Sequence, residues 1–285
     1  MQKSRKKLWI TLAAVLTSVV LVCLVFGLLF RLKKVNVEFR NRASKEFTQL
    51  EEGVLENVKN SAEFGFGKNL LFMNFEENIA KIEKEHPFVK VEQVVRHFPN
   101  EVSVFISERT PRFRVKDKNS TNWFILDDDF KVLTKLTSAE VIEDGKYGNL
   151  SYEDITVEIS SSSLVIEAFI GDFVTAKYDS HIKQIGSGIL AAYNYKDIGK
   201  AKSISIKTEG TLEFEIVMKT SSTDTGDGCK IIVSGTDDLK LKTYSGLKLF
   251  ISTLQENPTA DLSNSTIIIG KNASGEYQGT FKTNP

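Results

Sequence analysis

The chain begins with a long run of apolar residues and continues with short segments whose apolar residues recur at strand or helix spacing. Residues 8–30 carry no charged side chain, and the residues outside the apolar set there are Thr11, Thr17, Ser18 and Gly27. As an α-helix this segment would reach roughly 35 Å, enough to cross a hydrocarbon core of about 30 Å. We therefore predict a membrane helix over 8–30, preceded by a short tail at 1–7.

A cleavable signal peptide is the alternative for this segment, because basic residues precede it. The apolar part of a signal peptide is only about 7–15 residues long and ends in small residues before the cut. Here the segment ends Leu28-Leu29-Phe30-Arg31, so we favour an uncleaved anchor. The tail contains Lys3, Arg5, Lys6 and Lys7, and the other flank contains Arg31, Lys33 and Lys34. The positive-inside rule therefore favours, by a small margin, a cytoplasmic N-terminus with residues 31–285 outside.

The region from 31 to 110 predicts the order strand, helix, helix, strand, strand. Period-2 alternation indicates the strands, and apolar residues three and four apart indicate the helices. Asn74 precedes Glu77 by three residues, which predicts a capping box at the second helix. The alternation slips at Val94-Val95, which indicates a β-bulge or a twist. The predicted elements are a strand at 35–39, helices at 45–60 and 75–85, and strands at 88–96 and 101–108.

The region from 111 to 285 predicts a second, mixed domain, so the fold class is α+β with a largely antiparallel sheet. Residues 123–126 and 130–133 form a hairpin pattern, and the segment 155–159 alternates like a strand. Residues 164–170 fit either a strand or the start of a helix. The later elements are a helix at 176–195, strands at 203–207, 212–218 and 230–233, a helix at 243–255, and strands at 266–269 and 276–281.

Charge and cysteine usage narrow the class of protein. The whole chain has 37 basic and 37 acidic residues, and the first seven residues hold four of the basic ones. Residues 31–285 therefore have 33 basic and 37 acidic side chains, a net charge of −4, whereas nucleic-acid-binding domains are usually basic. Because of this acidic balance we expect no nucleic-acid partner. Cys23 lies in the predicted membrane helix and cannot reach Cys229, so we expect no disulfide.

No pattern of residues indicates an enzyme. The chain lacks the H-E-x-x-H, G-x-S-x-G and P-loop motifs, and its three histidines are scattered. Asp127, Asp128 and Asp129 are adjacent, but calcium loops place their ligands at alternate positions, so a metal site is disfavoured. We expect no catalytic residue, no cofactor and no metal.

Four blocks of sequence resemble the POTRA domain of the bacterial FtsQ/DivIB division proteins, in order and at matching spacing. They cover residues 67–74, 86–89, 94–100 and 102–111, and each block alone would be weak. His86 and Phe88 depart from the family's pattern. A following hairpin, W-x-x-x-D, is also similar, although Phe130 stands where the family has a glycine. The motif residues are Pro87, Val89, Arg96, Pro99, Glu108, Arg109 and Pro111; a plain structural role, such as a solvated ion pair for Glu108 and Arg109, is the alternative.

The resemblance implies a domain organisation and a function. It implies a POTRA domain over 31–110 and a "β domain" over 111–285. It also implies a non-enzymatic scaffold at the division septum, which binds FtsL-like and DivIC/FtsB-like single-pass proteins outside the membrane and helps to recruit or regulate the septal cell-wall synthase. A membrane-anchored POTRA-type adaptor or sensor unrelated to division is the alternative.

The end of the chain is the candidate partner site. Only four residues follow the predicted strand 276–281, so it is expected to form an open sheet edge with unpaired backbone groups. In the family the partner adds a strand at this position, which the resemblance implies here as well. Under period-2 geometry Tyr277, Gly279 and Phe281 share one face, where the two rings would be anchors for the partner. The alternative is that both rings pack inward on the core.

Overall fold

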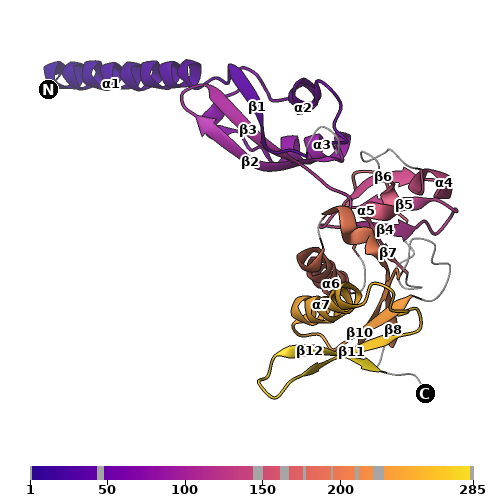
Figure 1. The fold of residues 1–285 in the computed structure, drawn as a ribbon. Coiled ribbons are helices and arrows are strands. Elements are labelled where there is room, and N and C mark those ends of the chain that lie inside the picture. Colours follow the sequence, from indigo (N-terminus) through magenta and orange to yellow (C-terminus); the bar gives the residue numbers. More distant parts are fainter. Residues whose placement is uncertain are drawn as a thin grey trace. The chain divides into compact units, whose positions relative to one another are not determined.

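The computed structural model of the protein describes residues 2–43, 48–143, 150–160, 167–175, 178–193, 195–208, 212–220 and 228–282 (Figure 1). The chain divides into two compact units, of which the first comprises Met1–Ala43 and Leu50–Glu108 and the second comprises the remainder. The fold is mixed α+β, with one N-terminal apolar helix and sheets that are largely antiparallel, as the sequence predicts.

Helix α1 (Gln2–Leu29) contains the apolar segment. Its stretch Thr11–Leu29 has a mean hydropathy of 2.8 and is not buried by the described residues, so by length and composition it is able to cross a membrane. The hydroxyl groups of Thr17 and Ser18 donate to the carbonyl oxygens of Ala13 and Ala14, at 2.8 and 2.9 Å, so these polar groups are satisfied within the helix. The helix begins at Gln2 and therefore includes most of the basic tail.

The rest of the first unit is a three-stranded sheet with helices packed on it. Strand order is β1-β3-β2; β1 runs parallel to β3, and β2 runs antiparallel to it. The helices pack on the face that carries Val102, Val104 and Ile106, and they contribute Val58 and Ile82 to this core. The elements are β1 (Lys34–Asn41), α2 (Val54–Ser61), the 3-10 turn η1 (Leu70–Phe72), α3 (Glu76–Glu85), β2 (Val89–His97) and β3 (Glu101–Glu108).

Three local predictions in this unit are wrong in detail. Helix α2 begins only at Val54, after Gly53 adopts a left-handed conformation with φ of 84° that ends the preceding segment; residues 44–47 of the predicted helix lie outside the described residues. Phe75 and not Asn74 is the N-cap of α3, and Asn74 Oδ1 instead accepts from the Glu76 amide at 3.1 Å. The β2 bulge falls at Glu92, because the register with β3 shifts between Val91 and Gln93.

The second unit is built on a nine-stranded sheet, counted over the described residues, with the order β12-β11-β10-β9-β8-β7-β4-β5-β6. The pairs β4·β7, β7·β8 and β10·β11 are parallel and the other pairs are antiparallel. The strands are β4 (Phe113–Lys116), β5 (Trp123–Leu126), β6 (Val132–Leu136), β7 (Val157–Ile159), β8 (Ala201–Thr208), β9 (Glu213–Met218), β10 (Cys229–Ser234), β11 (Thr266–Lys271) and β12 (Tyr277–Lys282).

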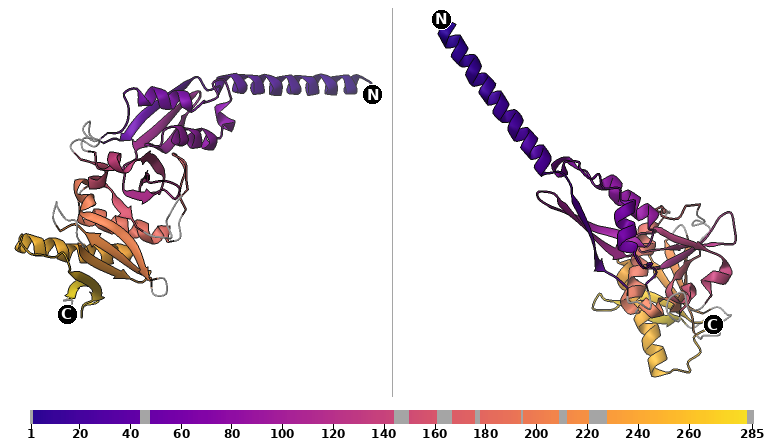
Figure 2. Two further views of the ribbon diagram at one scale, coloured as in Figure 1. Left: turned by 90° about the vertical axis from the view of Figure 1, so that its right-hand side faces the viewer. Right: turned by 90° about the horizontal axis from the view of Figure 1, so that it is seen from above.

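Helices α6 (Asp179–Ala192) and α7 (Leu239–Glu256) lie side by side against this sheet (Figures 1 and 2). They approach closely at Gly188, where a Cβ atom would lie 2.7 Å from the Lys240 carbonyl oxygen. Gly246 lets α7 approach the sheet in the same way, since a Cβ atom there would lie 2.6 Å from Ile231. Small residues at these two positions therefore set the spacing of the helix layer. The shorter helices are α4 (Ser138–Val141), α5 (Tyr152–Ile155) and η2 (Tyr195–Lys200).

The region around residue 155 departs from its predicted strand. Residues 152–155 form α5, because Ser151 and Asp154 make a reciprocal capping box that starts a helical turn, and the strand begins only at Val157. Residues 164–166 of the next predicted segment lie outside the described residues, and 167–170 form no strand.

Candidate functional site

Strand β12 is an edge strand of the nine-stranded sheet. It pairs antiparallel with β11 from Lys271↔Tyr277 to Thr266↔Lys282, and no described strand lies on its other side. The connecting turn is ordered by Asn272, whose Oδ1 accepts from the amides of Ser274 and Glu276 at 3.0 and 2.9 Å. The predicted sheet edge is therefore present, with one row of β12 backbone groups not used by a described strand.

The side chains of β12 alternate between α7 and solvent. Tyr277, Gly279 and Phe281 lie on the face toward α7, where they are buried or half-buried, whereas the side chains between and after them are exposed. Phe281 packs against the hydrophobic core of the second unit. The Phe281 ring thus serves the protein's own packing, and the outward face carries Gln278, Thr280 and Lys282.

Tyr277 joins the edge strand to the start of α7. Its hydroxyl oxygen lies 2.9 Å from Asp238 Oδ2 and 3.2 Å from Asp237 Oδ2. Desolvation raises the pKa of Tyr277 to about 12, and the hydrogen bond to Asp238 adds to this shift. The ammonium groups of Lys242 and Lys271 lie 5.4 and 5.0 Å from the ring centroid. The ring is therefore held by charges of both signs.

Lys242 organises the acidic side of this contact. Its ammonium donates to Asp237 Oδ1 and to the Ser234 carbonyl oxygen, both at 2.9 Å. The hydrogen bond from Lys242 to Asp237 lowers the pKa of the Asp237 carboxyl group. These partners of Tyr277 are missed by the sequence patterns, because Asp237 and Asp238 look like ordinary loop residues before a helix. Asp237 and Asp238 precede α7 in the sequence. Their contact with Tyr277 becomes visible only in the folded sheet, which brings residue 277 beside residue 238.

Gly279 lies where β12 packs closely on its neighbours. A Cβ atom there would lie 3.0 Å from Ile267 Cγ2 and 3.2 Å from Leu249 Cδ2, so β12 approaches α7 more closely than a larger residue permits without displacement. The glycine is placed between the two aromatic residues, on the same face. Gly279 consequently lets the backbone of β12 lie close to Leu249 of α7.

The motif residues of the first unit have local structural roles. Val89 is fully buried and pairs with Glu108, while Pro87 follows the last turn of α3. Pro99 lies in the exposed turn between β2 and β3 after a cis peptide bond. The Arg96 guanidinium donates to the Met73 carbonyl oxygen at 2.6 Å and lies 5.0 Å from the centroid of the Phe75 ring. Arg96 therefore fastens the segment before α3 to the sheet.

Arg109 is buried in the second unit, and a solvated ion pair with Glu108 is not what the structure shows. Its guanidinium forms an ion pair with Asp127 and a second one with Asp129 at 3.1 Å. Asp127 Oδ1 also accepts from the amides of Asp129 and Lys131, at 2.9 and 2.8 Å. The nearby Pro111 is also buried. The three-aspartate turn is thus organised by arginine; Arg112 approaches Asp128 at 3.3 Å.

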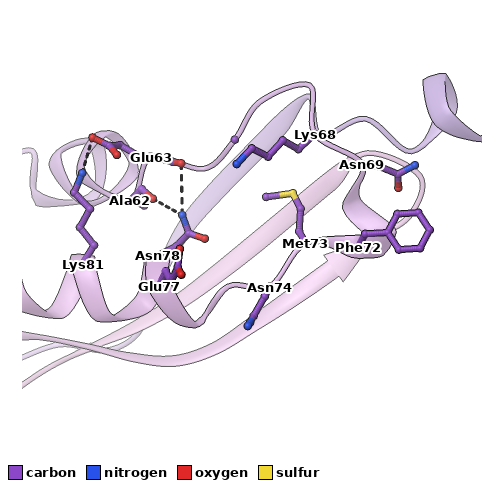
Figure 3. Close-up of a pocket in the computed structure, with 11 residues that line it drawn as sticks. Ala62, Glu63, Lys68, Asn69, Phe72, Met73, Asn74, Glu77, Asn78 and Lys81 are labelled. Atoms are coloured by element: carbon purple, nitrogen blue, oxygen red, sulfur yellow. Dashed lines mark hydrogen bonds and ion pairs between the residues drawn. The ribbon is translucent and has the colours of Figure 1, made fainter.

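A surface pocket of about 500 Å³ opens in the first unit, beside α3 (Figure 3). Its polar groups mainly bond one another: Asn78 Nδ2 donates to the Ala62 carbonyl oxygen at 2.6 Å, and Lys81 pairs with Glu63 (Figure 3).

Within the described part of the chain, no group of three His, Cys, Asp or Glu side chains is able to hold a metal ion. Burial raises the pKa of Cys229 to about 12, which makes its thiol a poor nucleophile.

Comparison of the chain with known protein-family models gave no match, and a search of curated protein sequences found no match either.

Proposed function

We propose that this protein is a non-enzymatic scaffold of the bacterial division machinery, similar to the FtsQ/DivIB family. In this proposal α1 anchors the chain in the cell membrane with its N-terminus in the cytoplasm. Residues 31–285 lie outside and are enriched at the septum. They bind FtsL-like and DivIC/FtsB-like single-pass proteins, and the complex helps to recruit or regulate the septal cell-wall synthase.

The observation that carries the proposal is the open edge at β12. An edge strand offers a row of backbone donors and acceptors to which an extended segment of a partner is able to add as a further strand. Its outward face is thinly charged, since Gln278 and Thr280 are uncharged and Lys282 comes only at the end. Because Tyr277 and Phe281 face α7, recognition in this proposal depends on the backbone of β12 and on the exposed side chains, and the two rings hold the edge in position.

The first unit supports the POTRA part of the proposal. Its order of elements is strand, helix, helix, strand, strand, and both helices pack on one face of the small sheet. The four blocks of matching sequence fall on η1 and the segment before α3, on the segment between α3 and β2, and on β2, β3 and the residues that join and follow these two strands. A protein-binding module between a membrane helix and a second domain suits a scaffold that gathers other single-pass proteins.

An adaptor or sensor unrelated to division is the second candidate. The structural roles of Val89, Arg96 and Arg109 favour this candidate. Residues that stabilise a fold are expected in any protein with that fold, so they do not indicate division in particular. Such a protein would use the same open edge. The identity of the bound partner separates the two candidates.

Photo-cross-linking in cells tests the proposal. A photoreactive phenylalanine analogue replaces Thr280 on the outward face of β12, and in a control it replaces Lys118, an exposed residue between β4 and β5. We expect the probe at 280 to capture an FtsL-like or DivIC/FtsB-like protein and the probe at 118 to capture neither. Capture of an unrelated protein at 280 would favour the adaptor, and equal capture at both positions would contradict binding at the edge.

Thiol labelling tests the proposed topology. In a Cys23→Ala, Cys229→Ala background, Lys118→Cys supplies one exposed thiol in the second unit. A membrane-impermeant reagent should label this thiol in intact spheroplasts. Labelling that requires lysis would place residues 31–285 in the cytoplasm.

A further inference from the structure

Four large apolar side chains of the first unit are exposed outside α1, and they lie in two loops. These are Phe66, Leu71, Phe72 and Phe98, which we call the juxtamembrane cluster. Phe72 is 84% exposed, Phe66 58% and Phe98 56%. Among the described residues of this unit they are the only exposed large apolar side chains beyond α1, so they form a concentrated feature and not a general property of its surface.

Both loops are bonded to the residues that directly follow α1. The Leu70 amide donates to the Phe30 carbonyl oxygen at 2.7 Å, and the Gly67 amide donates to that of Leu32 at 2.9 Å. These bonds hold the segment that carries Phe66, Leu71 and Phe72 beside the end of the helix. The Phe72 ring also points away from the Asn78 and Glu77 end of the pocket (Figure 3).

The second loop is tied to the same short segment. The Lys33 amide donates to the Asn100 carbonyl oxygen at 2.9 Å, and the Phe98 ring makes an edge contact with the Phe30 ring at a centroid distance of 5.7 Å. Phe30 is the last residue of the apolar segment. The cluster therefore surrounds the place where the chain leaves the apolar helix.

The charges around this place have the sign that suits a lipid surface. Arg31, Lys33 and Lys68 are exposed and make no salt bridge with a described residue, and Lys34 pairs with Glu101 at 3.1 Å. Segments that lie in a membrane interface bury apolar side chains such as Phe and Leu at the headgroup boundary, and basic residues near them interact with anionic lipid headgroups. The combination is the one expected at an interface and not in a domain that stands away from the bilayer.

We propose that the juxtamembrane cluster inserts into the interfacial region of the membrane and seats the first unit on the lipid surface. The occupant of this apolar surface is the bilayer itself, because the cluster is continuous with the helix that crosses it. This inference rests on the proposal that α1 spans the membrane. It gives the first unit a fixed depth at the bilayer, which a freely hinged domain after a membrane helix would lack.

Tryptophan quenching by brominated lipids tests this in the full-length protein. It is reconstituted into vesicles of phosphatidylcholine and phosphatidylglycerol with bromine on the acyl chains. In a Trp9→Phe, Trp123→Phe background, single tryptophans replace Phe72, Phe98 or, as the control, Phe88. Phe88 precedes β2 and lies at the opposite end of that strand from Phe98, roughly 30 Å away along the strand. A Trp123→Phe variant retains native Trp9 as the reporter of helix insertion.

We expect the emission maximum of the tryptophans at 72 and 98 to lie at shorter wavelength than that of the tryptophan at 88. We also expect the brominated lipids to quench the fluorescence of the tryptophans at 72 and 98 to an extent similar to that of Trp9, and not to quench the tryptophan at 88. Quenching of Trp9 together with unquenched emission at 72 and 98 would overturn the inference, leave the anchor intact and point to a protein that covers the cluster. Unquenched Trp9 would overturn the membrane anchor itself. Quenching at 88 equal to that at 72 would overturn the assignment of this particular surface.

Discussion

The hydroxyl group of Tyr277 lies 2.9 Å from Asp238 Oδ2, which places a side chain of the edge strand β12 against the first residues of α7. Residue 277 stands near the end of the chain, and residue 238 precedes the helix that covers the sheet. Because β12 has one neighbouring strand among the described residues, this contact with the start of α7 adds to the pairing with β11 in holding the edge. The geometry of the candidate partner site thus depends on a side chain that faces away from the partner.

This relationship predicts a pH dependence of stability. The pKa of Tyr277 in the folded protein is raised to about 12, above the usual value near 10. The protonated hydroxyl therefore stabilises the fold fully below pH 10, and that contribution is lost as the pH rises through about 12. We expect the free energy of unfolding to fall across this window more in the wild type than in Tyr277→Phe, as measured by urea unfolding at several pH values.

The same substitution should lower stability at neutral pH, because it removes the proton shared by Asp237 and Asp238. Gln278→Ala is the matched control, since Gln278 is the next residue and its side chain is exposed. An unchanged pH profile in Tyr277→Phe would mean that other tyrosines, such as the buried Tyr152 and the half-buried Tyr193, account for the loss at high pH.

Enlarging Gly279 should loosen the edge. Val at this position would bring a β-branched side chain against Ile267 and Leu249, which a Cβ atom alone would already approach to 3.0 and 3.2 Å. Overpacking of this kind costs about 1–3 kcal/mol of unfolding free energy. Gly270→Val on β11 is the control, because no atom lies within 4 Å of a Cβ built there. Equal melting temperatures for the two variants would show that the α7·β12 contact yields easily.

The elements with regular alternation are predicted well from the sequence. The strand predicted at 101–108 coincides with β3, and the last strand differs from its prediction by one residue. Both are predicted well because apolar and polar residues alternate along them with the period of a strand. A bulge or a twist is predicted in β2 at Val94-Val95, and the bulge lies at Glu92, since its position depends on which residue fails to pair with β3. Local capping by Ser151 overrides the alternation that predicts a strand from 155.

The candidate site is predictable only in part. The edge at the last strand is predicted, and β12 has one neighbouring strand among the described residues. Which face of that strand meets the core is not predictable, because Tyr277 and Phe281 are as suitable for an interface as for packing. The ion pair of Arg109 is likewise hidden, since its partner Asp127 lies eighteen residues away and is one of three adjacent aspartates that are equivalent in the sequence.

The Arg109–Asp127 pair should be important for the stability of the second unit. Asp127→Ala leaves a buried guanidinium without this partner and removes the acceptor of two backbone amides. Breaking a buried pair from one side costs about 3–5 kcal/mol. Asp128→Ala is the control: this exposed carboxylate pairs with Arg112, and such a pair contributes no more than about 1 kcal/mol. Chemical unfolding of the full-length variants in detergent measures both values, and similar losses for the two would contradict the ranking.

Phe130 offers a test in which two effects oppose each other. It has a left-handed backbone with φ of 63°, at the hairpin position where the resemblance leads one to expect glycine, yet its ring is fully buried and makes an edge contact with Phe113 at 5.2 Å. Left-handed conformation costs a residue other than glycine roughly 1–2 kcal/mol, whereas truncation of a buried phenylalanine costs about 3–5 kcal/mol. Burial is the larger effect, so Phe130→Gly should still destabilise the protein, by about 2 kcal/mol.

Phe130→Ala loses the same ring and keeps the strained backbone, so it should be less stable than Phe130→Gly by about 1 kcal/mol. This order is the reverse of that at an ordinary strand or helix position, where alanine is the more stable residue. Thermal unfolding of the two variants side by side is the measurement, and the ring loss that they share cancels in the comparison. An alanine variant more stable than the glycine variant would contradict the left-handed conformation of residue 130.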